Sequence, residues 1–161
     1  MKPLPALALT LLLTGCSAPS GDSGVQLYFR ADPQQTTHGP AIAAQPYTGQ
    51  GQPDVESLFA ALMSGPTEDD LVSPFPRGVT LLDWELSDGL LTLNLSEQYG
   101  GLTDVSLTLA DYCIVLTMSQ LDGVESVQIQ SAGYQGQARD HTVLQAQEAL
   151  LGWNEDSAAP S

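Results

Sequence analysis

The sequence predicts an α+β fold, with elements in the order β-α-β-β-α-β and two helices on one face of a mostly antiparallel sheet. Three observations favour this fold: segments that alternate apolar and polar residues, two segments with apolar residues at helical spacing, and Gly or Pro between them. A sheet with both helices on one face would bury every apolar stripe in that order.

The first strand is predicted over residues 25–30, where Val25, Leu27 and Phe29 alternate with more polar residues. Residues 31–53 are rich in Gln, Thr, Gly and Pro and have no sustained period. We expect a loop there, with room for a short extended piece near residues 41–42. So long a connection is either functional or poorly ordered, which makes it a candidate lid over a ligand.

The first helix is predicted over residues 54–64. Asp54 is a good N-cap, and Gly65-Pro66 supply a left-handed C-cap and a stop. The apolar residues between them recur at i, i+3, i+4, i+7 and i+8, which is the spacing of one helix face. They are Val55, Leu58, Phe59, Leu62 and Met63. An acidic loop at 67–71 and a proline-rich turn at 74–78 follow.

A β-hairpin is predicted next, because Asp88-Gly89 supplies the positive φ angles of a tight turn between two alternating segments. The apolar residues of its two strands are Leu82, Trp84 and Leu86, then Leu91, Leu93 and Leu95. We expect Trp84 to face the helices. Its replacement by alanine would then cost roughly 3–5 kcal/mol.

The second helix is predicted over residues 106–121, and a capping box of Thr108 and Asp111 would move its start slightly later. Its apolar stripe is Ala110, Cys113, Ile114, Thr117 and Leu121. A last strand is predicted over residues 124–131, with Val127 and Ile129 inward. In the C-terminal extension, 136–161, we expect a short helix over 142–151 with Val143, Ala146 and Leu150 on one side, and then a polar tail.

The N-terminus has the layout of an export signal: a positive start, then an apolar run at residues 4–13 that is too short for a bilayer span of about 20 residues. Leu13-Thr14-Gly15-Cys16 resembles the lipobox of bacterial lipoproteins. That resemblance implies cleavage between Gly15 and Cys16 and a lipid on the Cys16 thiol. Two acyl chains on one cysteine give stable anchoring. The alternative is a chance cysteine behind an ordinary signal.

The chain thus divides into a signal peptide (1–15), a tether of flexible composition (16–24), a domain (25–135) and the C-terminal extension (136–161). Its 19 acidic and 4 basic residues give a net charge of −15, which repels phosphate backbones and argues against nucleic-acid binding. Solubility explains this charge, and a basic partner or a divalent cation is the alternative. The densest acidic cluster, Glu68-Asp69-Asp70, lacks the ligand pattern of a calcium loop and is expected to be a solvated turn.

No GxSxG, P-loop, dinucleotide or HExxH motif is present in the sequence. Cys113 lies among apolar residues of a helix, where cysteine usually acts as a small core hydrophobe. Thr117 is expected to bond back along the same helix. We therefore expect no catalytic, cofactor-binding or metal-binding residues, and no enzyme.

Four blocks along the chain are similar to the GerMN domain, which is named after a spore-germination protein and is common in bacterial envelope lipoproteins. They are Leu62-Met63-Ser64-Gly65-Pro66, PFPRGVTLL at 74–82, Leu93-Asn94-Leu95-Ser96, and LTLADYCIVLTMSQLDGVESV at 107–127. The resemblance covers most of residues 25–135. It implies a fold like that of the ring-building modules of sporulation and secretion complexes, which can associate side by side.

The leading hypothesis is a non-catalytic module of the bacterial envelope, anchored by lipid on Cys16 to the outer face of the cell membrane. The resemblance implies a link to sporulation or germination. The expected partners are envelope proteins, the cell wall or a second copy. One alternative is an envelope lipoprotein that binds a small molecule or ion beneath the segment 31–53, and another is a hydrolase.

Overall fold

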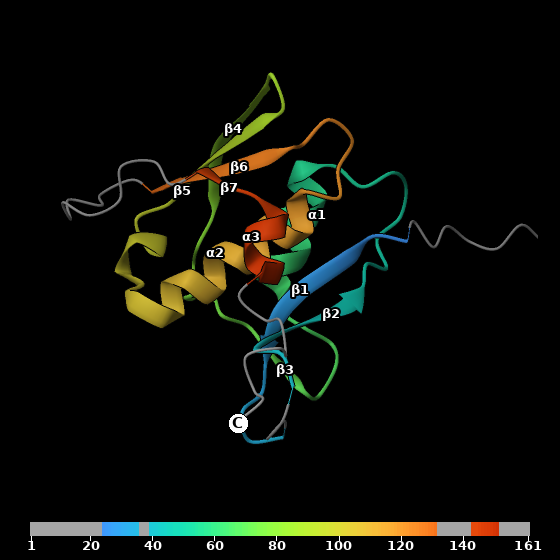
Figure 1. Cartoon of the computed structure of the whole chain (residues 1–161), viewed down its shortest axis with the longest axis vertical. Helices are drawn as coiled ribbons and strands as arrows, with labels where there is room; N and C mark the ends of the chain where they lie inside the picture. Colours follow the sequence, from blue (N-terminus) through green and yellow to red (C-terminus); the bar gives the residue numbers. More distant parts are fainter. Residues whose placement is uncertain (1–23, 36–38, 132–142, 152–161) are drawn as a thin grey trace, which may run out of the picture.

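Two sheets and two main helices make up the protein in its computed structural model, which describes residues 24–35, 39–131 and 143–151 (Figure 1). The predicted α+β class, with two main helices packed on mostly antiparallel sheets, is confirmed. The prediction of a single sheet is wrong, because the strands form two sheets and α2 contacts both of them. The strands are β1 (Gln26–Ala31), β2 (Ile42–Pro46), β3 (Leu71–Val72), β4 (Leu81–Ser87), β5 (Leu90–Leu95), β6 (Ser126–Ser131) and β7 (Val143–Leu144). The helices are α1 (Val55–Ser64), the 3-10 turn η1 (Tyr99–Gly101), α2 (Asp104–Met118) and α3 (Ala146–Leu151).

The first sheet has three strands in the order β2-β1-β3, all antiparallel. The predicted loop over residues 31–53, with its short extended piece near residues 41–42, is wrong over most of β2, which pairs with β1 from Gln26↔Pro46 to Arg30↔Ile42. The sequence of β2 has no alternation to mark it, and the strand exists because β1 offers it a backbone partner. This part of the predicted lid is therefore fixed in a sheet.

The second sheet has the order β4-β5-β6-β7. The predicted hairpin is confirmed: β4 and β5 are antiparallel, and Asp88 (φ 51°) and Gly89 (φ 81°) form the turn between them. β5 pairs with β6 in parallel, with Leu91 opposite Val127 and Leu93 opposite Ile129. Parallel neighbours need a crossover connection, and α2 lies within this one.

Helix α1 has the predicted start and stop. The Asp54 carboxylate accepts the Ser57 N–H at 2.8 Å, and the Ser57 hydroxyl accepts the Asp54 N–H at 3.0 Å. Hydrogen bonding from Ser57 lowers the pKa of Asp54 below its ordinary value. Gly65 has the expected positive φ (87°), but its ψ of 170° is extended, so the cap differs from the left-handed form that we predicted.

Helix α2 begins earlier than predicted, with Thr103 as its N-cap, and it ends at Met118. The predicted capping box is wrong. The Thr108 hydroxyl donates to the Asp104 carbonyl at 3.1 Å, and Asp111 is buried, where its carboxylate accepts the Tyr99 hydroxyl at 2.6 Å. The start of this helix is exposed from Thr103 to Ser106, and its N-cap Thr103 makes no side-chain capping hydrogen bond.

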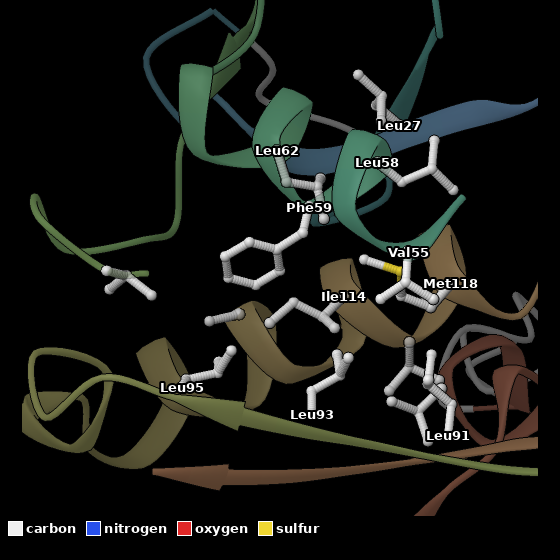
Figure 2. Close-up of a cluster of buried hydrophobic side chains, with 14 of the residues drawn as sticks. Leu27, Val55, Leu58, Phe59, Leu62, Leu91, Leu93, Leu95, Ile114 and Met118 are labelled. Atoms are coloured by element: carbon white, nitrogen blue, oxygen red, sulfur yellow. The ribbon is translucent and has the colours of Figure 1, made fainter. Parts of the chain in front are cut away.

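The core lies on both sides of α2. Figure 2 shows Leu91, Leu93 and Leu95 of β5 pointing at α2 from one side and Phe59 of α1 from the other. Residues of α2 from Cys113 to Met118 are all buried, so the C-terminal half of this helix lacks the polar face of a surface helix. The helix also contacts β1 and β6, and thus joins the two sheets.

Strand β4 is more exposed than we predicted. Trp84 lies opposite Leu93 and Leu86 opposite Leu91, so both side chains lie on the helix-covered face as expected. They are nevertheless 38% and 39% exposed, because β4 is the end strand of the sheet. Leu82 is 54% exposed beside a register shift between Leu81 and Asp83, where the alternation breaks.

The C-terminal helix is confirmed in part. The structure places Val143–Leu144 in β7, antiparallel to β6, so Val143 does not belong to the helix face that we predicted. Helix α3 begins only at Ala146. Within residues 24–35, 39–131 and 143–151, no helix has the length and apolar character needed to cross a bilayer.

Candidate functional site

The predicted lipidation site lies outside the described residues. This holds for Gly15, for Cys16 and for all of the tether 16–24 except Gly24. Cleavage and acylation at this site therefore remain predictions from the sequence. The first strand that the structure describes, β1, starts at Gln26.

Cys113 is fully buried on α2, as predicted for a core residue. Burial raises the pKa of this thiol to about 12, because a thiolate loses its hydration in the apolar interior. Only the thiolate is a good nucleophile. Cys113 therefore serves packing rather than chemistry.

We expect the Cys113 thiol to be unreactive toward a thiol reagent in the folded protein at about pH 8, and reactive after unfolding. Its folded pKa, about 12, exceeds the ordinary value of 9.0. Above pH 9 the thiol ionises in the unfolded chain but not in the folded one, which favours unfolding. The stability that the protonated Cys113 contributes is therefore complete below pH 9 and is lost as the pH rises from 9 to about 12. Labelling of a Cys16→Ala variant with a thiol reagent, with and without urea, reports on this thiol alone, because Cys113 is then the remaining cysteine of the sequence. Rapid labelling without urea would contradict the burial.

The hydroxyl of Thr117 connects α2 to β1. It donates to the Cys113 carbonyl at 2.8 Å, which is the predicted bond back along the helix, and it accepts the Tyr28 N–H at 3.1 Å. One turn later, the Gln120 side chain accepts the Gln26 N–H at 2.9 Å and donates to the Gln26 carbonyl at 2.8 Å. Strand β3 pairs only with the C-terminal end of β1, at Arg30 and Ala31. Along the rest of that edge of β1, the side chains of Thr117 and Gln120 make the hydrogen bonds that a neighbouring strand would otherwise make.

The acidic cluster Glu68-Asp69-Asp70 is exposed, as predicted for a solvated turn. Its backbone groups hold it in place: the Asp69 carbonyl accepts the Gln35 amide at 2.7 Å, and the Asp70 carbonyl accepts the Asp32 N–H at 2.8 Å. In the part of the chain that the structure describes, no three His, Cys, Asp or Glu side chains gather as a metal site would require.

An open groove of about 450 Å³ runs between α1 and β4. Its apolar lining comes from Phe59 and Met63 of α1, and from Leu82 and Trp84 of β4. Glu56 lies at the groove, where its carboxylate accepts the indole N–H of Trp84 at 3.2 Å. The groove thus joins exposed apolar surface to a carboxylate.

Strand β4 adds further negative charge beside the groove. Asp83 and Glu85 are exposed, and the strand, LLDWELS, carries no basic residue. Reasoning from the sequence missed this surface. The alternation of Leu82, Trp84 and Leu86 is the same for a central strand and an edge strand, so only the strand order distinguishes them.

Comparison with protein families matches residues 26–137 to Germane, described as sporulation and spore germination. This match covers more than half of the chain. The chain belongs to the Germane family. This match confirms the GerMN resemblance seen in the sequence. It also confirms the link of this domain to sporulation and germination. The comparison with curated proteins gave no match.

Solved structures with a similar fold include Germane (GerMN) domains of the sporulation protein GerM from Bacillus subtilis. The first GerMN domain matches with a TM-score of 0.55 and 12% identity, over 76% of this chain and 95% of that one. The tandem GerMN domains match with a TM-score of 0.51 and 20% identity, over 69% of this chain. This chain spans only 39% of that tandem structure. A protein from Clostridium perfringens, described as a candidate lipoprotein, matches at 0.47 with 18% identity, over 81% of this chain and 95% of that one.

Proposed function

We propose that this Germane protein is a lipoprotein of the bacterial envelope, anchored through Cys16 and acting outside the cytoplasm as a non-catalytic interaction module. The position of Leu13-Thr14-Gly15-Cys16 carries the proposal, since this segment ends a short apolar run and shortly precedes the family domain at residue 26. The ten residues from Ser17 to Gln26, fully extended, reach about 35 Å. They would hold the domain close to the membrane surface.

The non-catalytic role is supported by how α2 uses its reactive side chains. The Cys113 thiol is buried with a raised pKa, and the Thr117 hydroxyl is already engaged by Cys113 and Tyr28. We further propose that the partners are envelope proteins or the cell wall, in a process of sporulation or germination. The net charge of −15 argues against nucleic acid as a partner.

Replacement of Cys16 by alanine is expected to abolish membrane anchoring. The native protein should begin at Cys16, carry the mass of its acyl chains and enter the detergent phase, because two chains hold a protein stably at a bilayer. Cys16→Ala should lack this added mass and stay in the aqueous phase. Mass spectrometry and detergent partitioning measure both properties.

The matched control is Cys113→Ala, which removes the other cysteine of the chain and should leave acylation unchanged. An unacylated native chain that begins upstream of residue 16 would refute the proposed anchor and its location.

A further inference from the structure

We infer that the outer edge of β4, together with the groove beside α1, binds an extended basic segment of a partner protein as an added strand. This inference names the partner chemistry of the interaction module proposed above and therefore rests on that proposal. The argument depends on the strand edge, on the side chains that flank it, and on charge.

Strand β4 offers the longest open edge among the strands that the structure describes. It pairs with β5 on one side and is the end of its sheet. The other end strands are less suitable, because β3 and β7 have two residues each and β2 ends at Pro46. The open side of β1 is closed by Thr117 and Gln120. From Asp83 to Ser87, β4 is regular, and an open regular edge is a template for strand addition.

The side chains of β4 suggest the pattern of the added strand. Trp84 and Leu86 are partly exposed on the helix-covered face, and Trp84 lines the groove. Asp83 and Glu85 lie on the opposite face, since neighbouring residues of a strand point to opposite sides. An added strand would therefore place apolar side chains beside Trp84 and basic side chains beside the two carboxylates.

Charge favours a basic segment over a second copy of this chain. Two β4 strands paired with each other would bring Asp83 and Glu85 of both copies together, and like charges across a strand pair are destabilising. Each copy also carries a net charge of −15, which opposes association. A partner rich in Lys or Arg would be attracted by the same groups, with Glu56 at the groove as a further acidic neighbour.

The inference is tested with a labelled peptide of about ten residues that alternates Lys and Val, and with a counterpart that alternates Glu and Val. The full acylated protein in detergent micelles should bind the Lys-Val peptide, as measured by fluorescence anisotropy, and should not bind the Glu-Val peptide. Amide hydrogen exchange at residues 83–87 should slow when the Lys-Val peptide binds, because the added strand occupies the edge.

Two double variants with the same change in net charge separate the β4 edge from general attraction. Asp83→Lys/Glu85→Lys should weaken binding about tenfold or more, since charges in contact contribute more than distant ones. Asp69→Lys/Asp70→Lys, placed in an exposed turn just before β3, should weaken it by about twofold or less, since distant surface charges are screened by salt. All four positions are exposed, and circular dichroism checks that both variants fold.

Three results would overturn the inference. The first is equal weakening of peptide binding by the two double variants, and the second is peptide binding that leaves amide exchange at residues 83–87 unchanged. The third is a dimer, seen in sedimentation, that Asp83→Lys/Glu85→Lys dissociates and Asp69→Lys/Asp70→Lys does not. The last result would make a second copy the occupant. Failure here is distinguishable from failure of the proposed function, because the β4 variant leaves acylation at Cys16 unchanged and the Cys16→Ala variant leaves peptide binding unchanged.

Discussion

Replacement of Phe29 by alanine is expected to lower the free energy of unfolding by roughly 3–5 kcal/mol, the range for an aromatic side chain removed from a packed core. Phe29 is fully buried on β1. It belongs to the same core cluster as Leu58 of α1 and Ile114 of α2. Its removal leaves a cavity in that cluster, where β1 contacts both helices.

The matched comparison is Trp84→Ala, a second aromatic truncation on a strand. Trp84 faces the helices as predicted but is 38% exposed, so the expected cost falls from the roughly 3–5 kcal/mol of a fully buried aromatic side chain to about 1–2 kcal/mol. Urea denaturation monitored by circular dichroism measures both costs. Equal losses for the two variants would mean that β4 is buried as deeply as β1, and would remove the exposed edge on which the proposed docking surface depends.

Replacement of Thr117 by valine is expected to cost about 1–3 kcal/mol, although the two side chains have nearly the same shape. Valine offers no acceptor to the Tyr28 N–H, which now bonds to the Thr117 hydroxyl at 3.1 Å. Because Thr117 is fully buried, water has little access to replace the lost partner. The cost is therefore that of an unsatisfied donor rather than of a cavity.

Thr117→Ser separates these two causes, since serine keeps the hydroxyl and removes only a methyl group. We expect Thr117→Ser to be the more stable of the two variants in urea, and amide exchange at Tyr28 to accelerate in Thr117→Val alone. If the serine variant were the less stable one, the methyl group would matter more than the hydrogen bond to β1.

The elements that the sequence predicts best are those governed by local rules. Helix α1 has its cap, its apolar spacing and its terminating Gly-Pro within one short segment. The turn at Asp88-Gly89 requires positive φ angles, and this dipeptide is among the few that adopt them readily. Cys113 and Thr117 are predicted correctly for a similar reason, because their apolar neighbours along the helix already place them in the core.

The features that the sequence does not reveal depend on partners far along the chain. Strand β2 has no apolar alternation, and it forms because β1 provides a backbone partner. The division of the strands into two sheets follows from α2, which packs against β1 on one sheet and β6 on the other. The exposure of Trp84 depends on strand order, and a periodic pattern contains no information about strand order.

The closure of β1 by α2 also constrains the order in which the chain can fold. The side chains that satisfy Tyr28 and Gln26 come 89 and 94 positions later in the sequence. Contacts of such long separation form slowly. A chain that is synthesised N-terminus first therefore has an open edge on β1 until Gln120 has followed, and open edges recruit other chains. A holding chaperone would matter most during that interval, and a nascent chain arrested before Gln120 should aggregate.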